Sequence, residues 1–249
     1  MRLILFDIDG TLIFGHGVGH RSLVCAMEET FGTSGDHDRY DWRGKTDPQI
    51  VRELMRSEGI PPSMVEEKLA TCFDRYVRHL EELLSNGHRV DVLPGIAELV
   101  QDLGWRSDVL VGLLTGNIER GAKAKLRPTG LLPFFQVGSY GSDDSNRRHL
   151  PAIARDRAQA LVRHDIAFSD IDIIGDTPLD VDCARAVGAR AIAVATGQHS
   201  VGELQDANPD LLFENFGHLE ACLRTLEYRP LPAPHRRVSS LSPRQEGQQ

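Results

Sequence analysis

Two carboxylates stand at the end of the first apolar run of the chain, in the stretch Leu3-Ile4-Leu5-Phe6-Asp7-Ile8-Asp9-Gly10-Thr11. The four apolar residues predict a strand that is buried on both faces, as in a parallel sheet, and Gly10 permits a sharp change of direction after it. Two like charges about 4 Å apart repel by roughly 4 kcal/mol at an effective dielectric of about 20. A bound cation or a shared proton would relieve that repulsion, so Asp7 and Asp9 predict a functional site.

Two later apolar strands also end in polar residues. The run at 109–114 leads into Thr115-Gly116-Asn117, and the run at 171–174 leads into Gly175-Asp176-Thr177-Pro178-Leu179-Asp180. Each polar residue alone could be a turn residue or a helix N-cap. Because the carboxyl ends of parallel strands share one edge of a sheet, we expect all three groups to converge there.

The elements between these strands predict an α/β protein with a parallel sheet and right-handed crossovers. Residues 20 to 90 have helical periodicity without a convincing buried strand. There, Asp47 before Pro48 predicts a helix N-cap, and Ser63 with Glu66 predicts a capping box. Beyond them we expect helices near 95–103, 118–127, 148–163 and 217–226, and a further helix that follows Asp180 and ends at Val187. We expect strands at 109–114, 134–137, 171–174, 191–195 and 211–213. Residues 229–249 are rich in Pro, Arg, Ser and Gln, which predicts a disordered tail.

Taken together, these residues resemble the haloacid dehalogenase-like superfamily, and its phosphoglycolate-phosphatase-like members in particular. Residues 7–11 match its Asp-x-Asp-Gly-Thr motif, 114–117 match its second motif, and 175–177 with Asp180 match its acidic fourth motif. The resemblance covers about residues 1–225. It implies a Rossmann-like core at 1–14 and 93–225, with an inserted helical cap at 15–92.

The resemblance also implies a Mg²⁺-dependent phosphatase that hydrolyses a small phosphorylated metabolite. Asp7 would attack phosphorus and form an aspartyl-phosphate, and Asp9 would protonate the leaving alkoxide and then deprotonate water. Mg²⁺ would be held by Asp7, by the backbone carbonyl of Asp9 and by Asp176, with Asp180 ligating or holding a metal water. Phosphoryl oxygens would be bound by Thr115 and by the backbone at the following helix N-terminus. We expect that phosphate site to include Gly10, Gly116 and Asn117.

The third motif of the superfamily usually supplies a lysine, and this chain has none in the corresponding stretch 142–149. Arg147 is our choice for this cation, because arginine keeps the charge but grips phosphate through a different shape. Lys125, on the helix after Thr115, is the second candidate for phosphate binding. Arg148 is a further candidate for the third-motif cation, but it could equally be an exposed arginine at the start of a helix.

Substrate choice would lie in the cap, where Arg43-Gly44-Lys45-Thr46-Asp47 offers two cations and a hydroxyl. Arg43 and Thr46 are our candidates for substrate contacts. The competing interpretation has equal weight: Thr46 and Asp47 only cap a helix, and Arg43 and Lys45 are solvated. The glycine-rich stretch at 15–20 predicts a hinge, with His16 and His20 in solvent.

The composition narrows the class of protein. A net charge of −8 argues against a general binder of nucleic acid or of anionic membranes, and the first apolar run is too short to span a membrane. The four cysteines are far apart, which predicts free thiols in a reducing, cytoplasmic compartment. We expect a monomer or a homodimer acting on a small phosphorylated metabolite. The alternatives are a sugar-phosphate mutase and a catalytically silent binding protein on the same scaffold.

Overall fold

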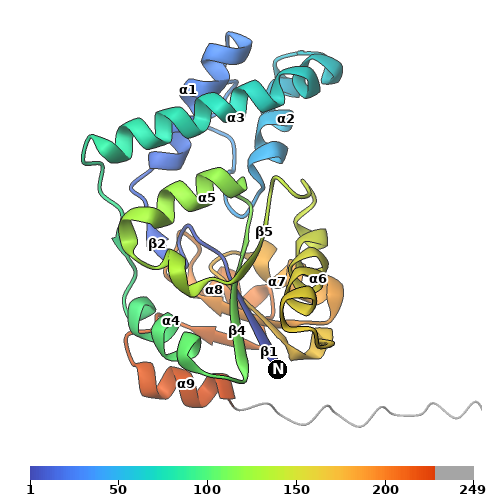
Figure 1. Cartoon of the computed structure of the whole chain (residues 1–249). Coiled ribbons are helices and arrows are strands. Elements are labelled where there is room, and N and C mark those ends of the chain that lie inside the picture. The colour runs from blue at the N-terminus through green and yellow to red at the C-terminus, as the bar shows by residue number, and fades with distance from the viewer. Residues whose placement is uncertain (228–249) are drawn as a thin grey trace, which may run out of the picture.

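The computed structural model describes residues 1–227, and a six-stranded parallel sheet lies at the centre of this part of the chain (Figure 1). The spatial order of its strands is β5 (Val137–Tyr140), β4 (Val109–Thr115), β1 (Arg2–Phe6), β6 (Ile171–Gly175), β7 (Arg190–Val194) and β8 (Leu211–Phe213). All neighbouring pairs are parallel. The α/β prediction is confirmed.

Strand β1 explains how the sheet is covered on both faces. Ile4 and Phe6 point into one apolar cluster, and Leu3 and Leu5 point into another, as period-2 alternation requires. The first cluster is closed by α4 (Ile96–Trp105), α5 (Glu119–Leu126) and α9 (Leu219–Glu227). The second is closed by α6 (Leu150–Val162), α7 (Pro178–Val187) and α8 (Val201–Asp206). The buried sheet therefore serves as a rigid platform for the loops at its carboxyl edge.

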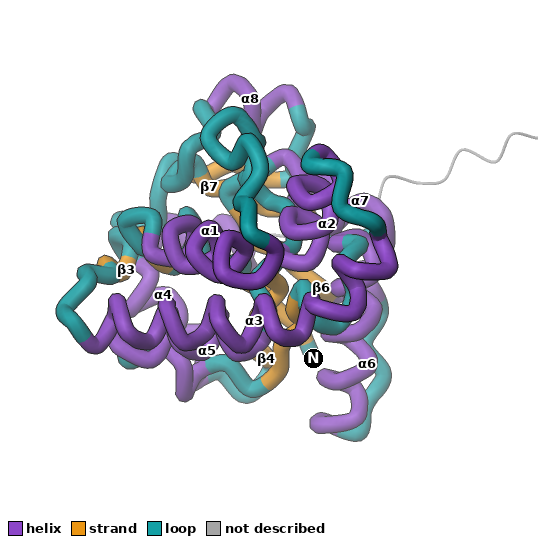
Figure 2. Tube along the Cα trace, turned by 90° about the horizontal axis from the view of Figure 1, so that it is seen from above, coloured by secondary structure: helices purple, strands orange, loops and turns teal. Residues whose placement is uncertain are grey.

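Three helices pack together beyond that edge and form what we call the helical unit: α1 (Val18–Phe31), α2 (Asp47–Ser57) and α3 (Pro62–Ser85) (Figure 1). They share an apolar cluster that includes Met27, Met55 and Leu80. Figure 2 shows α1 and α3 running side by side over the sheet. The cluster also takes in Ile118 and Ala124, at and within α5, so the helical unit packs directly on the helix that follows Thr115.

A short antiparallel ladder joins the two connections to the helical unit. Strand β2 (Ile13–Phe14) pairs with β3 (Asp91–Val92), where the chain leaves the sheet platform and where it returns. The sequence does not predict either strand, because two residues are too few to show an alternating pattern.

Several local expectations differ from the structure. The N-cap of α2 is Thr46 rather than Asp47, and its hydroxyl accepts from the backbone N–H of Gln49. Helix α3 begins at Pro62 after the N-cap Pro61, so Ser63 lies inside the helix and makes no capping box. Strand β5 starts at Val137 because Leu132–Phe134 forms a 3₁₀ turn. Helix α8, opened by a capping box between Ser200 and Glu203, is missing from the sequence prediction.

The predicted tail at 229–249 lies outside the described residues. Within residues 1–227, no helix combines the length and the apolar character needed to cross a membrane.

Candidate active site

The carboxyl edge of the sheet brings the predicted groups together. In the register of the strands, Phe6 of β1 lies beside Leu113 of β4 and Ile174 of β6. Asp7, Thr115 and Asp176 follow within two residues of these positions, so residues more than a hundred positions apart in the chain become neighbours. The expectation that the three strand ends converge is confirmed.

Arg147 lies against the first aspartate. Its guanidinium is buried, with Nη2 3.1 Å from Asp7 Oδ1 and a second, closer ion pair with Asp180. Nη1 donates to the carbonyl of Gly44 at 2.9 Å. Burial opposes its charge, but Asp180 and Asp7 raise the pKa of Arg147, so it is a cation at any physiological pH. Among the described residues, its buried Nε–H has no hydrogen-bond partner.

Three buried carboxylates converge beside Arg147. Oxygens of Asp7, Asp176 and Asp180 lie within 4.8 Å of one another. Burial, together with the neighbouring carboxylates, raises the pKa of Asp7 to about 6 and raises that of Asp176. Three negative groups facing one guanidinium leave an excess of negative charge that a divalent cation would neutralise.

The same cluster has the chemistry of a magnesium site. Mg²⁺ prefers oxygen ligands from a few carboxylates, completed by water and by a phosphate oxygen. The backbone approaches these oxygens closely at Gly10 and Gly197, where an added Cβ would collide with the Asp176 carboxylate. Thr11, which the sequence predictions do not single out, donates to Asp176 Oδ1 at 3.0 Å and fixes its orientation. The residues present therefore fit the ion.

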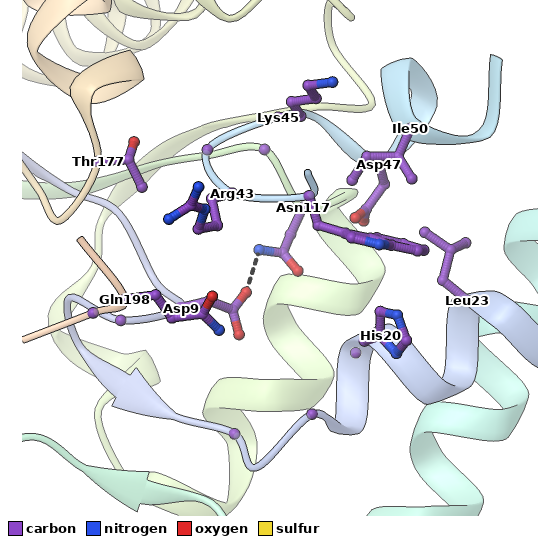
Figure 3. A pocket seen from close by; sticks show the side chains of 18 of the residues that line it. Asp9, His20, Leu23, Arg43, Lys45, Asp47, Ile50, Asn117, Thr177 and Gln198 are labelled. Atoms are coloured by element: carbon purple, nitrogen blue, oxygen red, sulfur yellow. Dashed lines mark hydrogen bonds between the residues drawn. The ribbon is translucent and has the colours of Figure 1, made fainter. Parts of the chain in front are cut away.

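Asp9 lies on the other side of the site, where α5 begins. Its Oδ2 accepts from Lys125 Nζ at 2.6 Å. The same oxygen accepts from Asn117 Nδ2 at 2.8 Å (Figure 3). Asn117 Oδ1 accepts from Lys125 at 2.6 Å, and Asn117 also donates to Thr115 Oγ1 at 2.9 Å. Lys125 therefore pairs with Asp9, whereas Arg147 pairs with Asp7. The two third-motif candidates occupy different places in the same site.

The predicted loop at 43–47 meets the site only in part. Thr46 is fully buried; it donates to the carbonyl of Ser145 at 2.9 Å and caps α2, so the helix-capping interpretation replaces the substrate contact expected for it. Arg43 does border the cavity, but its guanidinium is paired with both oxygens of Asp41 at 2.8 and 3.1 Å. Arg148 makes an exposed pair with Asp182.

Asp47 is a residue that the sequence predictions assign only to helix capping. Its Oδ2 accepts from the backbone N–H of Ile118 at 2.8 Å, and its own N–H donates to the carbonyl of Gly116 at 2.8 Å. Burial raises its pKa to about 6, with Lys125 acting in the opposite direction. Only its place before Pro48, at a helix start, marks it in the sequence.

A cavity of about 930 Å³ joins the carboxylates to the helical unit (Figure 3). Its border includes His20 and Leu23 of α1, Ile50 of α2 and the preceding Trp42, as well as Asp7 and Asp9. The rings of His20 and Trp42 meet edge to face, with centroids 4.5 Å apart. His20 is thus half-buried rather than solvated, and burial, with His37, lowers its pKa. His16 stays exposed and pairs with Asp91 at 2.8 Å.

The sequence model of the haloacid dehalogenase-like hydrolase family matches residues 4–194 of this chain. The chain belongs to this family. A phosphoglycolate phosphatase of Synechococcus elongatus is 29% identical over 216 residues, covering 86% of this chain and 93% of the relative. Phosphoglycolate phosphatase 1 of Pseudomonas aeruginosa is 27% identical over 233 residues, covering 89% and 79%.

Two solved structures show the same fold. CbbY from Rhodobacter sphaeroides in complex with phosphate has a TM-score of 0.65 at 19% identity, covering 88% of this chain and 96% of that one. A candidate beta-phosphoglucomutase from Bacteroides vulgatus has a TM-score of 0.67 at 20% identity, covering 91% and 88%. The haloacid dehalogenase-like, Rossmann-like core expected from the motifs is confirmed.

Proposed function

We propose that this hydrolase is a Mg²⁺-dependent phosphatase that cleaves a small phosphomonoester through an aspartyl-phosphate on Asp7. The observation that carries the proposal is the meeting of Asp7, Asp9 and Arg147 with the carboxylates of Asp176 and Asp180 at one edge of the sheet. The relatives named phosphoglycolate phosphatase support the same reaction class.

In the first step, an oxygen of Asp7 attacks phosphorus in line, and the bond between phosphorus and the substrate oxygen breaks. Asp9 gives its proton to that leaving oxygen. In the second step, a water attacks the phosphoryl group and Asp9 takes its proton. The bond between phosphorus and Asp7 then breaks, which releases phosphate and restores the carboxylate of Asp7 and the protonated carboxyl of Asp9.

Phosphoryl oxygens would be held by fixed donors around Asp7. Arg147 offers its free Nε–H, and Thr115 and Asn117 lie at the start of α5, where backbone N–H groups favour anions. When bound by Asp7, the Asp9 carbonyl, Asp176 and Asp180, Mg²⁺ would stabilise the negative charge of the phosphoryl group.

The helical unit would act as the cap of the enzyme. Residues 15–92 would close the cavity over the substrate, and its side chains, Trp42 and His20 among them, would meet the leaving group. Exclusion of water from the cavity would strengthen the electrostatic interactions inside it.

The test is the release of inorganic phosphate from 4-nitrophenyl phosphate, with and without Mg²⁺, by the wild type and by Asp7→Asn. We expect turnover that needs Mg²⁺ and is lost in the variant. Turnover that survives Asp7→Asn would overturn the assignment of the nucleophile. Bound Mg²⁺ without turnover of any phosphomonoester would favour a silent scaffold, and transfer to a second sugar hydroxyl without net phosphate release would favour a mutase.

A further inference from the structure

Lys125 is a buried ammonium inside the site. Lys125 as a whole residue is 4% exposed. By contrast, the side chain of Lys123, two positions earlier on α5, is 49% exposed and pairs with Glu119. Burying a charge is costly unless partners replace its water. The partners of Lys125 are Asp9 Oδ2 and Asn117 Oδ1, each at 2.6 Å.

The carboxylate that Lys125 holds would otherwise be loosely placed. The side chain of Asp9 is 44% exposed and precedes Gly10, a residue with a φ of +84°. Its Oδ2 receives two donors, Lys125 Nζ and Asn117 Nδ2, and both come from the segment that starts at the end of β4. These two contacts hold one oxygen of the carboxylate and restrict its rotamers.

The helical unit closes around this ammonium. Gly19 of α1 lies so near that an added Cβ would be 2.7 Å from Lys125 Nζ and 2.9 Å from its Cε. The hydroxyl of Tyr76 on α3 lies beside the same point, and the charge of Asp47 acts on Lys125 from α2. Groups from all three helices of the unit thus surround the ammonium, with Gly19 of α1 closest to it, so the place of Lys125 depends on how the unit sits on α5.

Arg147 lies elsewhere, 3.1 Å from Asp7, and already supplies the cation expected beside the nucleophile. Lys125 is therefore free for another task. We propose that Lys125 is a positioning residue for Asp9, which holds the acid–base carboxylate toward the leaving oxygen and depends on Gly19 of the helical unit for its own place. This inference rests on the proposed function, in which Asp9 protonates the leaving group.

The experiment compares phenyl phosphate with 4-nitrophenyl phosphate, two substrates with one ring and different leaving groups. Nitrophenolate leaves without protonation, whereas phenolate benefits from a proton donor. In Lys125→Gln we expect kcat/KM for phenyl phosphate to fall about 10–100-fold, as a fraction of the general-acid contribution. For 4-nitrophenyl phosphate we expect a fall of about 3-fold or less. Asp9→Asn should show the same selectivity with a larger loss, and Lys123→Gln should leave both substrates unchanged.

A second variant tests the same point without removing a charge. Gly19→Ala places a methyl group against Lys125, although alanine is normally favourable in a helix. We expect its thermal midpoint to stay near that of the wild type and its loss on phenyl phosphate again to exceed its loss on 4-nitrophenyl phosphate.

Equal losses on both substrates in Lys125→Gln, accompanied by weaker inhibition by inorganic phosphate, would overturn the inference in favour of a phosphate-binding lysine. The phosphatase proposal would survive that result. Failure of the wild type on every phosphomonoester tested would instead reject the phosphatase proposal, and the inference with it.

Discussion

The carboxylate of Asp47, on the first turn of α2, accepts a hydrogen bond from the backbone N–H of Ile118, the residue that caps α5. A side chain of the helical unit thus satisfies a donor at the start of a helix that packs on the sheet. Negative charge is favourable at a helix N-terminus, but this carboxylate is fully buried and its pKa is raised to about 6.

This contact predicts a pH-dependent effect of Asp47→Asn. A carboxyl whose folded pKa lies above its unfolded value of 3.8 contributes stability that is fully present below pH 3.8 and is lost as the pH rises through about 6. A shift of this size corresponds to about 2–3 kcal/mol. Because asparagine keeps an acceptor for Ile118 and cannot ionise, the variant should be more stable than the wild type at pH 8.

Urea unfolding of both proteins from pH 5 to pH 8 would measure this effect. The difference in the free energy of unfolding should shrink as the pH falls toward 5, where the wild-type carboxyl is protonated in the fold. A difference that stays constant across this range would mean that the charge of Asp47 does not destabilise the folded protein.

We expect substitution of Arg147 to lower the free energy of unfolding much more than substitution of its neighbour Arg148. Arg147→Met would leave Asp7 and Asp180 buried without their counter-charge, and breaking a buried ion pair costs about 3–5 kcal/mol. Arg148→Met is the matched control, because the side chain of Arg148 is 59% exposed and a solvent-exposed ion pair such as the one with Asp182 contributes little to stability. Urea unfolding in the absence of Mg²⁺ would compare them, and equal stability of the two variants would contradict the role of Arg147 in the carboxylate cluster.

The groups at the strand ends could be predicted because a parallel sheet needs little further information. Once 3–6, 109–114 and 171–174 are recognised as buried strands, Asp7, Thr115 and Asp176 must share an edge. The partners of Lys125 and Asp47 could not be predicted in this way. They depend on how the helical unit lies on α5, and the helical periodicity of 20 to 90 fixes which faces are apolar but not where they dock.

Short elements account for the remaining differences in the fold. The ladder between Ile13–Phe14 and Asp91–Val92 has two residues on each side, and its pairing joins positions far apart in the chain. At residue 134 an apolar sequence that also suits a strand folds as a 3₁₀ turn. Tertiary context decides such segments, because their own propensities differ by less than about 1 kcal/mol.

The carboxylate cluster predicts that Mg²⁺ stabilises the protein. An ion present at about 100 times its dissociation constant adds about 2.7 kcal/mol to the free energy of unfolding. Asp176→Asn should lose most of this gain, because it removes a charged oxygen from the cluster of three carboxylates. Asp165→Asn, at an exposed position, is the control and should keep it. Thermal unfolding with and without Mg²⁺ would test this, and a full response in Asp176→Asn would place the ion elsewhere.

The aromatic wall of the cavity predicts how the leaving group is bound. Trp42 and His20 meet edge to face and border the same cavity as Asp7 and Asp9. Trp42→Ala should therefore raise KM for phenyl phosphate by about 10-fold, about the 1.4 kcal/mol that such an aromatic contact is worth, with kcat nearly unchanged. For a phosphomonoester substrate without a ring, KM should change much less. Steady-state kinetics on both substrates would measure this difference, and equal changes in KM, or a fall in kcat alone, would show that Trp42 shapes the site as a whole rather than contacting the leaving group.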